Sequence, residues 1–582
     1  MRDVRLHGLI AASAIGAVLA GACGRSEPAQ PQPATASLPA PATPTAVTPL
    51  ASLPKIDPAA ILQHIKVLSL DKLQGRAPGT VGEDLTVGYL QTQFKDLGLA
   101  PGNPDGTYVQ KVPLVGITGA EARPLTFTTG AQKLSLKWKD DVVAWSKHVA
   151  ESAAIDSSDV VFAGYGVEAP EYGWDDFKGL DVKGKTIIVL VNDPPVPDPA
   201  DPAKLNPKMF GGKAMTYYGR WTYKFEEGAR KGAAAVLIVH ETEPAAYPFS
   251  VVQGNLGEKF DVIPPDKNMG RVNIEGWITV DAARKLFAMG GQDYDALKKQ
   301  AIAKDFKAVP LGLKASMGIR NTLRTINSQN VVAKLEGSDP AVKDEYVVYT
   351  AHWDHLGVGI PVNGDKIYNG ARDNAAGVSV MLEVARAFTK VQPRPKRSIL
   401  FTMVTAEEQG LLGSAYYAVT PLYPLAKTLA DINVDSPNVY APSNDVTVIG
   451  MGASDLDDYL LQAAKEQGRS LRPDPQPEKG YYYRSDHFNF AKQGVPALYT
   501  ESGVEARTPK PADYLRKKLD DYEAHDYHAP SDEVKPDWDL TGTAEDAQLV
   551  FAVGYRVANA DRFPDWKPGN EFKAKRDAML KK

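Results

Sequence analysis

The chain from about Asn321 onward alternates short apolar runs with helical segments, and this alternation constrains the fold more than any other feature. In order, the segments are EYVVYTA, VSVMLEVARAF, SILFTMV, ADINV, DLDDYLLQAAKEQG and PALYTES. Buried strands that alternate with helices form a mainly parallel sheet covered on both faces. Ligands of such sheets bind beyond the carboxyl ends of the strands. The residues that follow each strand are therefore candidate functional residues.

Histidines and carboxylates stand after or between these predicted strands. The set comprises His352, Asp354, Asp373, Glu407, Glu408, Asp435 and His528. Each alone has an ordinary explanation, since a single histidine is usually a satisfied loop residue and an aspartate before a helix is usually a cap. Together they are the nitrogen and oxygen ligands that a hydrolytic zinc site takes while leaving a position for water. The pattern therefore favours a metal-dependent hydrolase.

Five motifs that contain these residues resemble those of a known family. They are AHWDH, YNGARDNAAG, TAEEQGLLGS, INVDS and YHAPSDE. In this order and spacing they are similar to the motifs of the co-catalytic di-zinc aminopeptidases, the clan MH zinc peptidases that include aminopeptidase S, aminopeptidase Y and glutamate carboxypeptidase II. The resemblance implies an α/β fold with a mainly parallel mixed sheet flanked by helices.

The resemblance also implies a role for each metal ligand and two Zn²⁺ ions per chain. His352 and Asp435 would hold one zinc, Glu408 and His528 would hold the other, and Asp373 would bridge them. Two metals in such a site clamp a hydroxide and polarise the scissile carbonyl together.

Three further residues receive catalytic or supporting roles from the same resemblance. Glu407 would be the general base that takes the proton of the attacking water. Asp354 would accept a hydrogen bond from the His352 ring and fix its tautomer. Tyr482, in GYYYRSDHF, would stabilise the oxyanion. Asp486 and His487, in the same motif, are interpreted as supporting structure.

The remainder of the folded chain divides into two predicted parts. Residues 55–156 are expected to open the peptidase domain, which resumes over residues 321–582. Residues 157–320 are expected to form an inserted β-rich domain, because short buried strands such as GKTIIVLVN and GAAAVLIVH lie among proline-rich loops. The stretch GYGVEAPEYGWDDFKGLDVKGKTIIVL resembles a protease-associated domain.

The N-terminus is typical of an exported bacterial lipoprotein. Residues 1–23 carry two arginines, an apolar run and the lipobox-like sequence LAGAC, which ends at Cys23, the single cysteine. Residues 24–54 are rich in Pro and Ala and predict an extended tether. We therefore expect a lipid anchor at Cys23 and a location at the outer membrane, facing the periplasm or the cell surface. A plain secretory signal cut near Ala22 is the alternative.

The expected function is that of an extracytoplasmic zinc exopeptidase, an aminopeptidase acting on a peptide substrate. A carboxypeptidase or deacylase could use the same metals, a binding relative would lack ligands, and a glutaminyl cyclase would use one zinc. With 66 basic and 71 acidic residues, the chain offers no broad positive field for nucleic acid. The preferred side chain and the oligomeric state stay open at this point.

Overall fold

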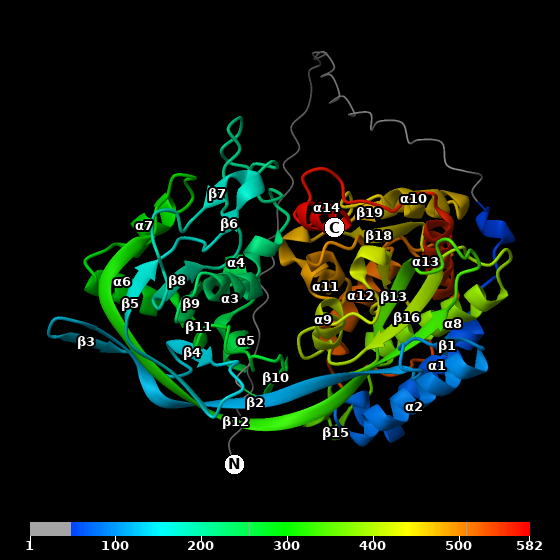
Figure 1. The fold of residues 1–582 in the computed structure, drawn as a ribbon, viewed down its shortest axis with the longest axis horizontal. Helices are drawn as coiled ribbons and strands as arrows, with labels where there is room; N and C mark the ends of the chain where they lie inside the picture. Colours follow the sequence, from blue (N-terminus) through cyan, green and yellow to red (C-terminus); the bar gives the residue numbers. More distant parts are fainter. Residues whose placement is uncertain (1–47, 255–256, 508, 582) are drawn as a thin grey trace, which may run out of the picture. The chain divides into compact units, whose positions relative to one another are not determined.

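The computed structural model describes residues 48–254, 257–507 and 509–581. One sheet, here called the core sheet, dominates the C-terminal half (Figure 1). Its strands, in spatial order, are β19 (Ser470–Pro473), β18 (Asp445–Ile449), β20 (Ala497–Ser502), β17 (Thr428–Asn433), β13 (Tyr346–His352), β16 (Ser398–Val404) and the end of β12 (Val309–Leu335). The pairs from β20 to β16 are parallel, whereas β18 and β12 run antiparallel to their inner neighbours. The predicted mainly parallel mixed sheet is therefore confirmed.

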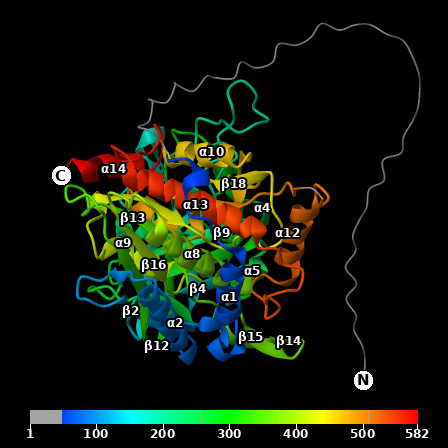
Figure 2. The same ribbon diagram turned by 90° about the vertical axis from the view of Figure 1, so that its right-hand side faces the viewer.

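Helices cover both faces of the core sheet, as the buried central strands require. One face packs against α1 (Pro58–Leu68), α2 (Val81–Asp96), α8 (Gly377–Lys390), α10 (Leu456–Glu466) and α13 (Thr541–Asn559), which lie toward the viewer in Figure 2. The opposite face packs against α9 (Leu412–Val419) and α11 (His487–Lys492). Along β13, Val347 and Tyr349 point to the first face, and Tyr346 and Val348 point to the second. This alternation follows from the two-residue period of a strand.

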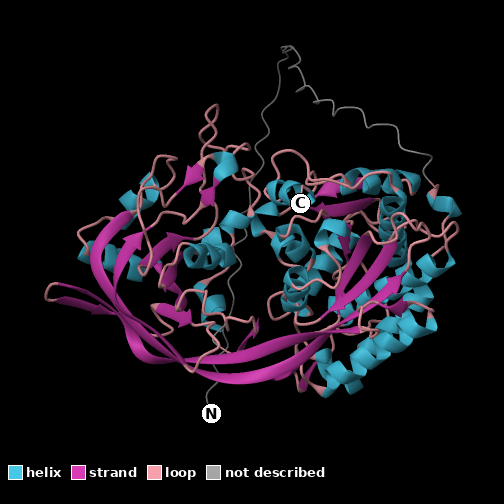
Figure 3. Ribbon diagram, in the orientation of Figure 1, coloured by secondary structure: helices cyan, strands magenta, loops and turns pink. Residues whose placement is uncertain are grey.

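Two very long strands lead from the core sheet into a second group of strands, here called the insert sheet. β2 (Val109–Thr129) and β12 pair antiparallel from Val109↔Val331 to Thr128↔Lys314. Beyond them the insert sheet continues through β5 (Ser152–Phe162), β8 (Thr186–Leu190), β9 (Ala235–His240), β11 (Ile274–Thr279) and β4 (Val142–Trp145). The pairs from β5 to β11 are parallel, and only β4 is reversed. Figure 3 shows the β2–β12 ribbon connecting the two groups of strands.

The helix between β8 and β9, α3 (Trp221–Arg230), packs against β9 and buries Tyr223 and Phe225. The expected domain border between residues 320 and 321 falls inside β12. β4, which belongs to the expected opening part of the peptidase domain, pairs with β11 of the insert sheet. The likeness of this region to a protease-associated domain stays a prediction.

The predicted signal segment, lipobox and most of the tether lie outside the described residues. The described chain begins just before a short helical turn at Leu50–Ser52. Among the described residues, every helix is too short or too polar to cross a membrane.

Candidate active site

The core sheet brings five of the predicted residues to its carboxyl edge. His352 is the last residue of β13, Asp435 comes two residues after β17, and Glu407 and Glu408 follow β16. Asp373 lies in the turn Ala371–Ala376 that precedes α8. This arrangement follows from the topology, because parallel strands end at one common edge.

His528 joins this edge from the loop after α12 (Tyr514–His525), where its backbone is left-handed with φ of 56°. Its Nε2 lies 3.0 Å from Glu408 Oε2 and 3.3 Å from Asp373 Oδ2. His352 Nε2 lies 3.2 Å from Asp373 Oδ1 and 3.3 Å from Asp435 Oδ1. The two oxygens of Asp373 therefore face two different imidazoles, and each imidazole has a second carboxylate beside it.

Glu407 and Asp354 stand beside this set. Glu407 Oε2 lies 3.9 Å from His352 Nε2, and its side chain is 10% exposed. The carboxylate of Asp354 accepts the backbone N–H of Glu407 at 3.0 Å, which fixes the start of the glutamate turn. His352 Nδ1 lies 3.2 Å from the backbone oxygen of Asp354 and 3.8 Å from its carboxylate. Asp354 therefore contacts both the histidine ring and the turn that carries the glutamates.

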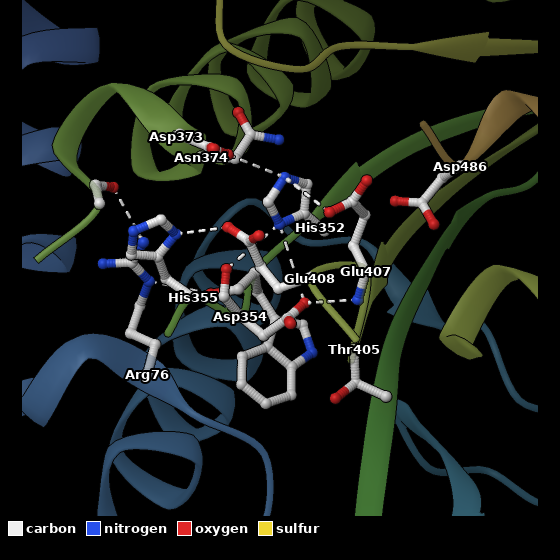
Figure 4. A network of polar contacts seen from close by, with 12 residues as sticks. Arg76, His352, Asp354, His355, Asp373, Asn374, Thr405, Glu407, Glu408 and Asp486 are labelled. Atoms are coloured by element: carbon white, nitrogen blue, oxygen red, sulfur yellow. Dashed lines mark hydrogen bonds and ion pairs between the residues drawn. The ribbon is translucent and has the colours of Figure 1, made fainter. Parts of the chain in front are cut away.

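His355 is a site residue that the sequence analysis left without a role. Its Nδ1 lies 2.6 Å from Glu408 Oε1 (Figure 4). The other oxygen of this carboxylate, Oε2, faces His528. The His355 ring is fully buried, and its Nε2 has no hydrogen-bond partner among the described residues. A donor on one carboxylate oxygen fixes the rotamer of Glu408 and leaves the other oxygen free for a metal.

Buried polar groups hold the loops around these residues. Arg76, which is 1% exposed, donates to four backbone oxygens, those of Leu68, Trp353, Asn369 and Gly370. It thereby ties the N-terminal segment to the loop that follows His352 and to the loop that precedes Asp373. Asp532, four residues after His528, accepts the backbone N–H groups of Arg372 and Asp373. The His528 loop and the Asp373 turn are thus fixed to each other.

Tyr482 does not contact the predicted metal ligands at the carboxyl edge of the core sheet. Its ring packs against His487 and Phe572, with centroids 4.7 Å and 6.3 Å away, and it lines a cavity of about 360 Å³. Its hydroxyl is buried and has no partner among the described residues. Asp486 accepts a hydrogen bond from Ser414, and the His487 ring lies between Tyr482 and Tyr499.

The charges at the site favour a bound cation. Burial lowers the pKa of His528, but Glu408 and Asp373 outweigh burial and raise it to about 10. Burial holds the pKa of Glu407 well above its ordinary value, and the carboxylates of Asp435 and Glu408 add to this effect. Both shifts express an excess of buried negative charge, which a divalent cation would neutralise. The donors also fit a metal: one nitrogen and two oxygens of His352, Asp373 and Glu408 lie within 4.8 Å of one another, as do those of His352, Glu407 and Asp435.

Residues 330–552 match the family model described as Peptidase family M28. This segment is an M28 peptidase domain. It spans the core sheet from the end of β12 to α13 and contains all the residues predicted as metal ligands, together with Glu407, Asp354 and Tyr482.

Curated proteins match parts of this chain. Aminopeptidase NAALADL1 of Rattus norvegicus is 30% identical over 162 residues, which are 27% of this chain and 20% of the rat protein. A probable zinc metalloprotease of Pyrenophora teres f. teres is 38% identical over 110 residues, 19% of this chain and 23% of the relative. The matched regions thus span about a fifth of these two relatives. A solved aminopeptidase from Aneurinibacillus sp. strain AM-1 aligns over 88% of this chain and 96% of its own, with 19% identity and a TM-score of 0.45.

The contact between His355 and Glu408 leads to a testable prediction for the M28 domain. We expect His355→Ala to weaken metal binding by about 10–100-fold, because hydrogen bonds to a ligating side chain contribute this much to metal affinity. Competition with a chromophoric chelator measures the affinity. His525→Ala, which removes an exposed ring from α12, is the control and should bind metal as the wild type does. Equal affinities in all three proteins would contradict a role for His355.

Proposed function

We propose that the chain is a zinc-dependent exopeptidase that removes N-terminal residues from peptides. The observation that carries this proposal is the position of Asp373, whose two oxygens face His352 and His528 at 3.2 and 3.3 Å. A carboxylate between two imidazole–carboxylate pairs fits a bridge between two metal ions. The M28 family match and the names of the relatives agree with zinc and with aminopeptidase activity.

In this proposal, His352 and Asp435 would hold one zinc, Glu408 and His528 would hold the second, and Asp373 would contact both. Zinc in such a site acts as a Lewis acid toward the scissile carbonyl and lowers the pKa of water. His355 holds Glu408 with one oxygen turned toward the second set of donors. Asp354 and Asp532 hold the backbone of the glutamate turn and of the Asp373 turn, so the donors are positioned before the substrate arrives.

Glu407 is the residue proposed to move the proton. Its carboxylate is buried, with Oε2 3.9 Å from His352 Nε2, so it lies close enough to the proposed donors to accept a proton from the attacking water. Burial raises its pKa well above the ordinary value, which increases its strength as a base. The same carboxyl group then returns the proton to the nitrogen of the leaving amine.

Rates on paired substrates test the proposed function. The zinc-loaded protein should hydrolyse an aminoacyl p-nitroanilide with a free amino group and should leave its N-acetylated counterpart intact. A carboxypeptidase would instead release the last residue of peptides whose N-terminus is blocked. Hydrolysis of both members of the pair at equal rates would contradict an exopeptidase that requires a free N-terminus.

We further propose that the protein is exported and anchored by lipid at Cys23, which the sequence LAGAC and the Pro- and Ala-rich tether support. Cys23→Ser should therefore move the protein from the membrane fraction to the soluble fraction, because lipid anchoring would be lost. Fractionation followed by immunoblotting measures this. Wild-type protein found entirely in the soluble fraction, with a free Cys23 thiol, would contradict the anchor.

A further inference from the structure

Strand register places one more acidic residue, Glu501, level with the proposed metal ligands. β13 and β17 pair Thr350 with Asn433, so two residues further along His352 stands opposite Asp435. β17 and β20 pair Asn433 with Tyr499, so Asp435 stands opposite Glu501 by the same count. Side chains at equivalent positions of neighbouring parallel strands point to the same face of the sheet. His352, Asp435 and Glu501 thus form one row across three adjacent strands.

Contacts around Glu501 confirm the face to which it points. Tyr499, two residues earlier on β20, donates its hydroxyl to Glu501 Oε1 at 3.4 Å. The Tyr499 ring lies 4.9 Å from the ring of His487 in α11, on the face of the sheet where α9 and α11 pack. Glu501 therefore lies on the α11 face, one strand beyond Asp435.

The carboxylate of Glu501 has no strong partner of its own. Within the part of the chain that the structure describes, no Lys, Arg or His nitrogen lies within 4.0 Å of it, and the bond from Tyr499 is long. Arg372 is the nearby cation, but its guanidinium donates to the backbone oxygens of Ser436 and Pro437 and lies 4.2 Å from the Tyr522 ring centroid. Among the described residues, therefore, no cation pairs directly with the Glu501 carboxylate.

The surroundings of Glu501 make an added positive charge favourable. Burial raises the pKa of Glu501 to about 7; Arg372 opposes this effect, and Asp474 and Asp435 add to it. Asp474 lines the cavity that Tyr481 and Tyr482 also line. A desolvated carboxylate with two other carboxylates nearby gains more from a cation than one in water does.

We propose that Glu501 binds a positively charged group of the substrate, an ammonium or a guanidinium, next to the scissile bond. Adjacent strands lie about 4.8 Å apart, so Glu501 is one strand away from the ligands that would hold the reacting carbonyl. The charged group could be the α-ammonium of the first residue or the side chain of a first lysine or arginine. The inference rests on the proposed function, and it makes Glu501 a specificity-determining residue that favours substrates with a positive charge at this position.

Matched hydroxamates separate the two sources of charge. Leucine hydroxamate and 4-methylpentanoyl hydroxamate differ by the α-amine, and lysine hydroxamate and norleucine hydroxamate differ by the side-chain amine. Each inhibitor is measured on the zinc-loaded wild type and on Glu501→Gln, by calorimetry as well as by inhibition. For at least one pair, the wild type should favour the amine by about tenfold to a hundredfold, and the variant should lose this preference, because a charge-assisted hydrogen bond is worth that much.

Loss of preference in the leucine pair assigns Glu501 to the α-ammonium, and loss in the lysine pair alone assigns it to the side chain. Unchanged preferences in both pairs would overturn the inference, as would equal weakening of all four inhibitors. Glu501→Asp keeps the charge and should retain part of the preference, which guards against a folding defect in the glutamine variant. Glu505→Gln, at a half-exposed carboxylate paired with Arg472, is the matched control and should behave as the wild type.

The result also distinguishes this inference from the proposed function. Wild-type protein that hydrolyses no aminoacyl substrate would refute the proposed function, whatever the hydroxamate ratios are. Active wild-type protein with the same ratios in Glu501→Gln would refute only the role of Glu501.

Discussion

Glu407→Gln should retain its zinc and lose turnover by about 10²–10⁴-fold, the usual contribution of general acid–base catalysis. The amide keeps the size of the side chain but cannot take a proton from the attacking water. Because Glu407 is not placed between the two imidazoles, its loss should leave the metal ligands unchanged. Metal analysis and kcat on an aminoacyl p-nitroanilide measure the two quantities on the same preparation.

The adjacent residue, Glu408, provides the matched comparison for Glu407→Gln. Glu408→Gln should lose zinc, because an amide oxygen is a poorer zinc ligand than a carboxylate, and because Glu408 Oε2 lies 3.0 Å from His528 Nε2 in the donor set. Burial raises the pKa of Glu408, but the rings of His355 and His528 outweigh this effect and lower it to about 2, so Glu408 stays ionised over the working pH range. Equal zinc loss in both variants, or loss in Glu407→Gln alone, would show that the two roles are reversed.

Asp373→Ala should have the largest effect on metal content, since it removes the one carboxylate that faces both imidazoles. We expect both zinc ions to be lost or bound far more weakly, and turnover to fall to the background rate. Equilibrium dialysis against buffered zinc measures the affinity. Asp365→Ala, at an exposed position on β15 (Asp365–Tyr368), is the control and should keep its metal and activity.

A variant that loses zinc at only one set of ligands would contradict the bridging position of Asp373. Thermal unfolding should accompany the measurement, because Asp373 is buried and its backbone N–H is held by Asp532. A folded variant with full zinc content and reduced activity would place Asp373 outside the metal site.

The sequence predicted the core sheet and the convergence of the donors because both depend on local patterns. Mostly apolar runs such as SILFTMV mark buried strands, and residues after parallel strands share one edge. His352, Glu407 and Asp435 therefore reach the same place without any knowledge of the loops. The pairing of Asp373 with His528 depends on two loops far apart in the chain, and only the motif resemblance suggested it.

Other features depend on contacts that no local pattern reveals. Arg76 reads as an ordinary charged residue in the N-terminal segment, yet it donates to four backbone oxygens around the site. The role of His355 depends on a rotamer of Glu408, 53 positions away. Glu501 could have been found from the sequence, because it is the penultimate residue of the predicted strand PALYTES and so lies near the edge where the other candidates lie.

The expected border at residues 320 and 321 illustrates a limit of composition as a guide. The change of character near Asn321 is present in the sequence, but β12 runs through it as one strand from Val309 to Leu335. β12 pairs with β5 up to Arg320 and with β16 from Val331, so its partner changes just after the expected border although the strand itself continues. Sheet partners of this kind come from distant segments and are set by the tertiary fold.

Zinc titration of the metal-free protein tests the central claim, a two-zinc site bridged by Asp373, most directly. The wild type is stripped with a chelator, and activity on an aminoacyl p-nitroanilide is followed as zinc is added in known equivalents. We predict no activity without metal and full activity at two equivalents of zinc per chain. Full activity in the metal-free protein, or saturation of both binding and activity at one equivalent, would contradict the two-zinc site.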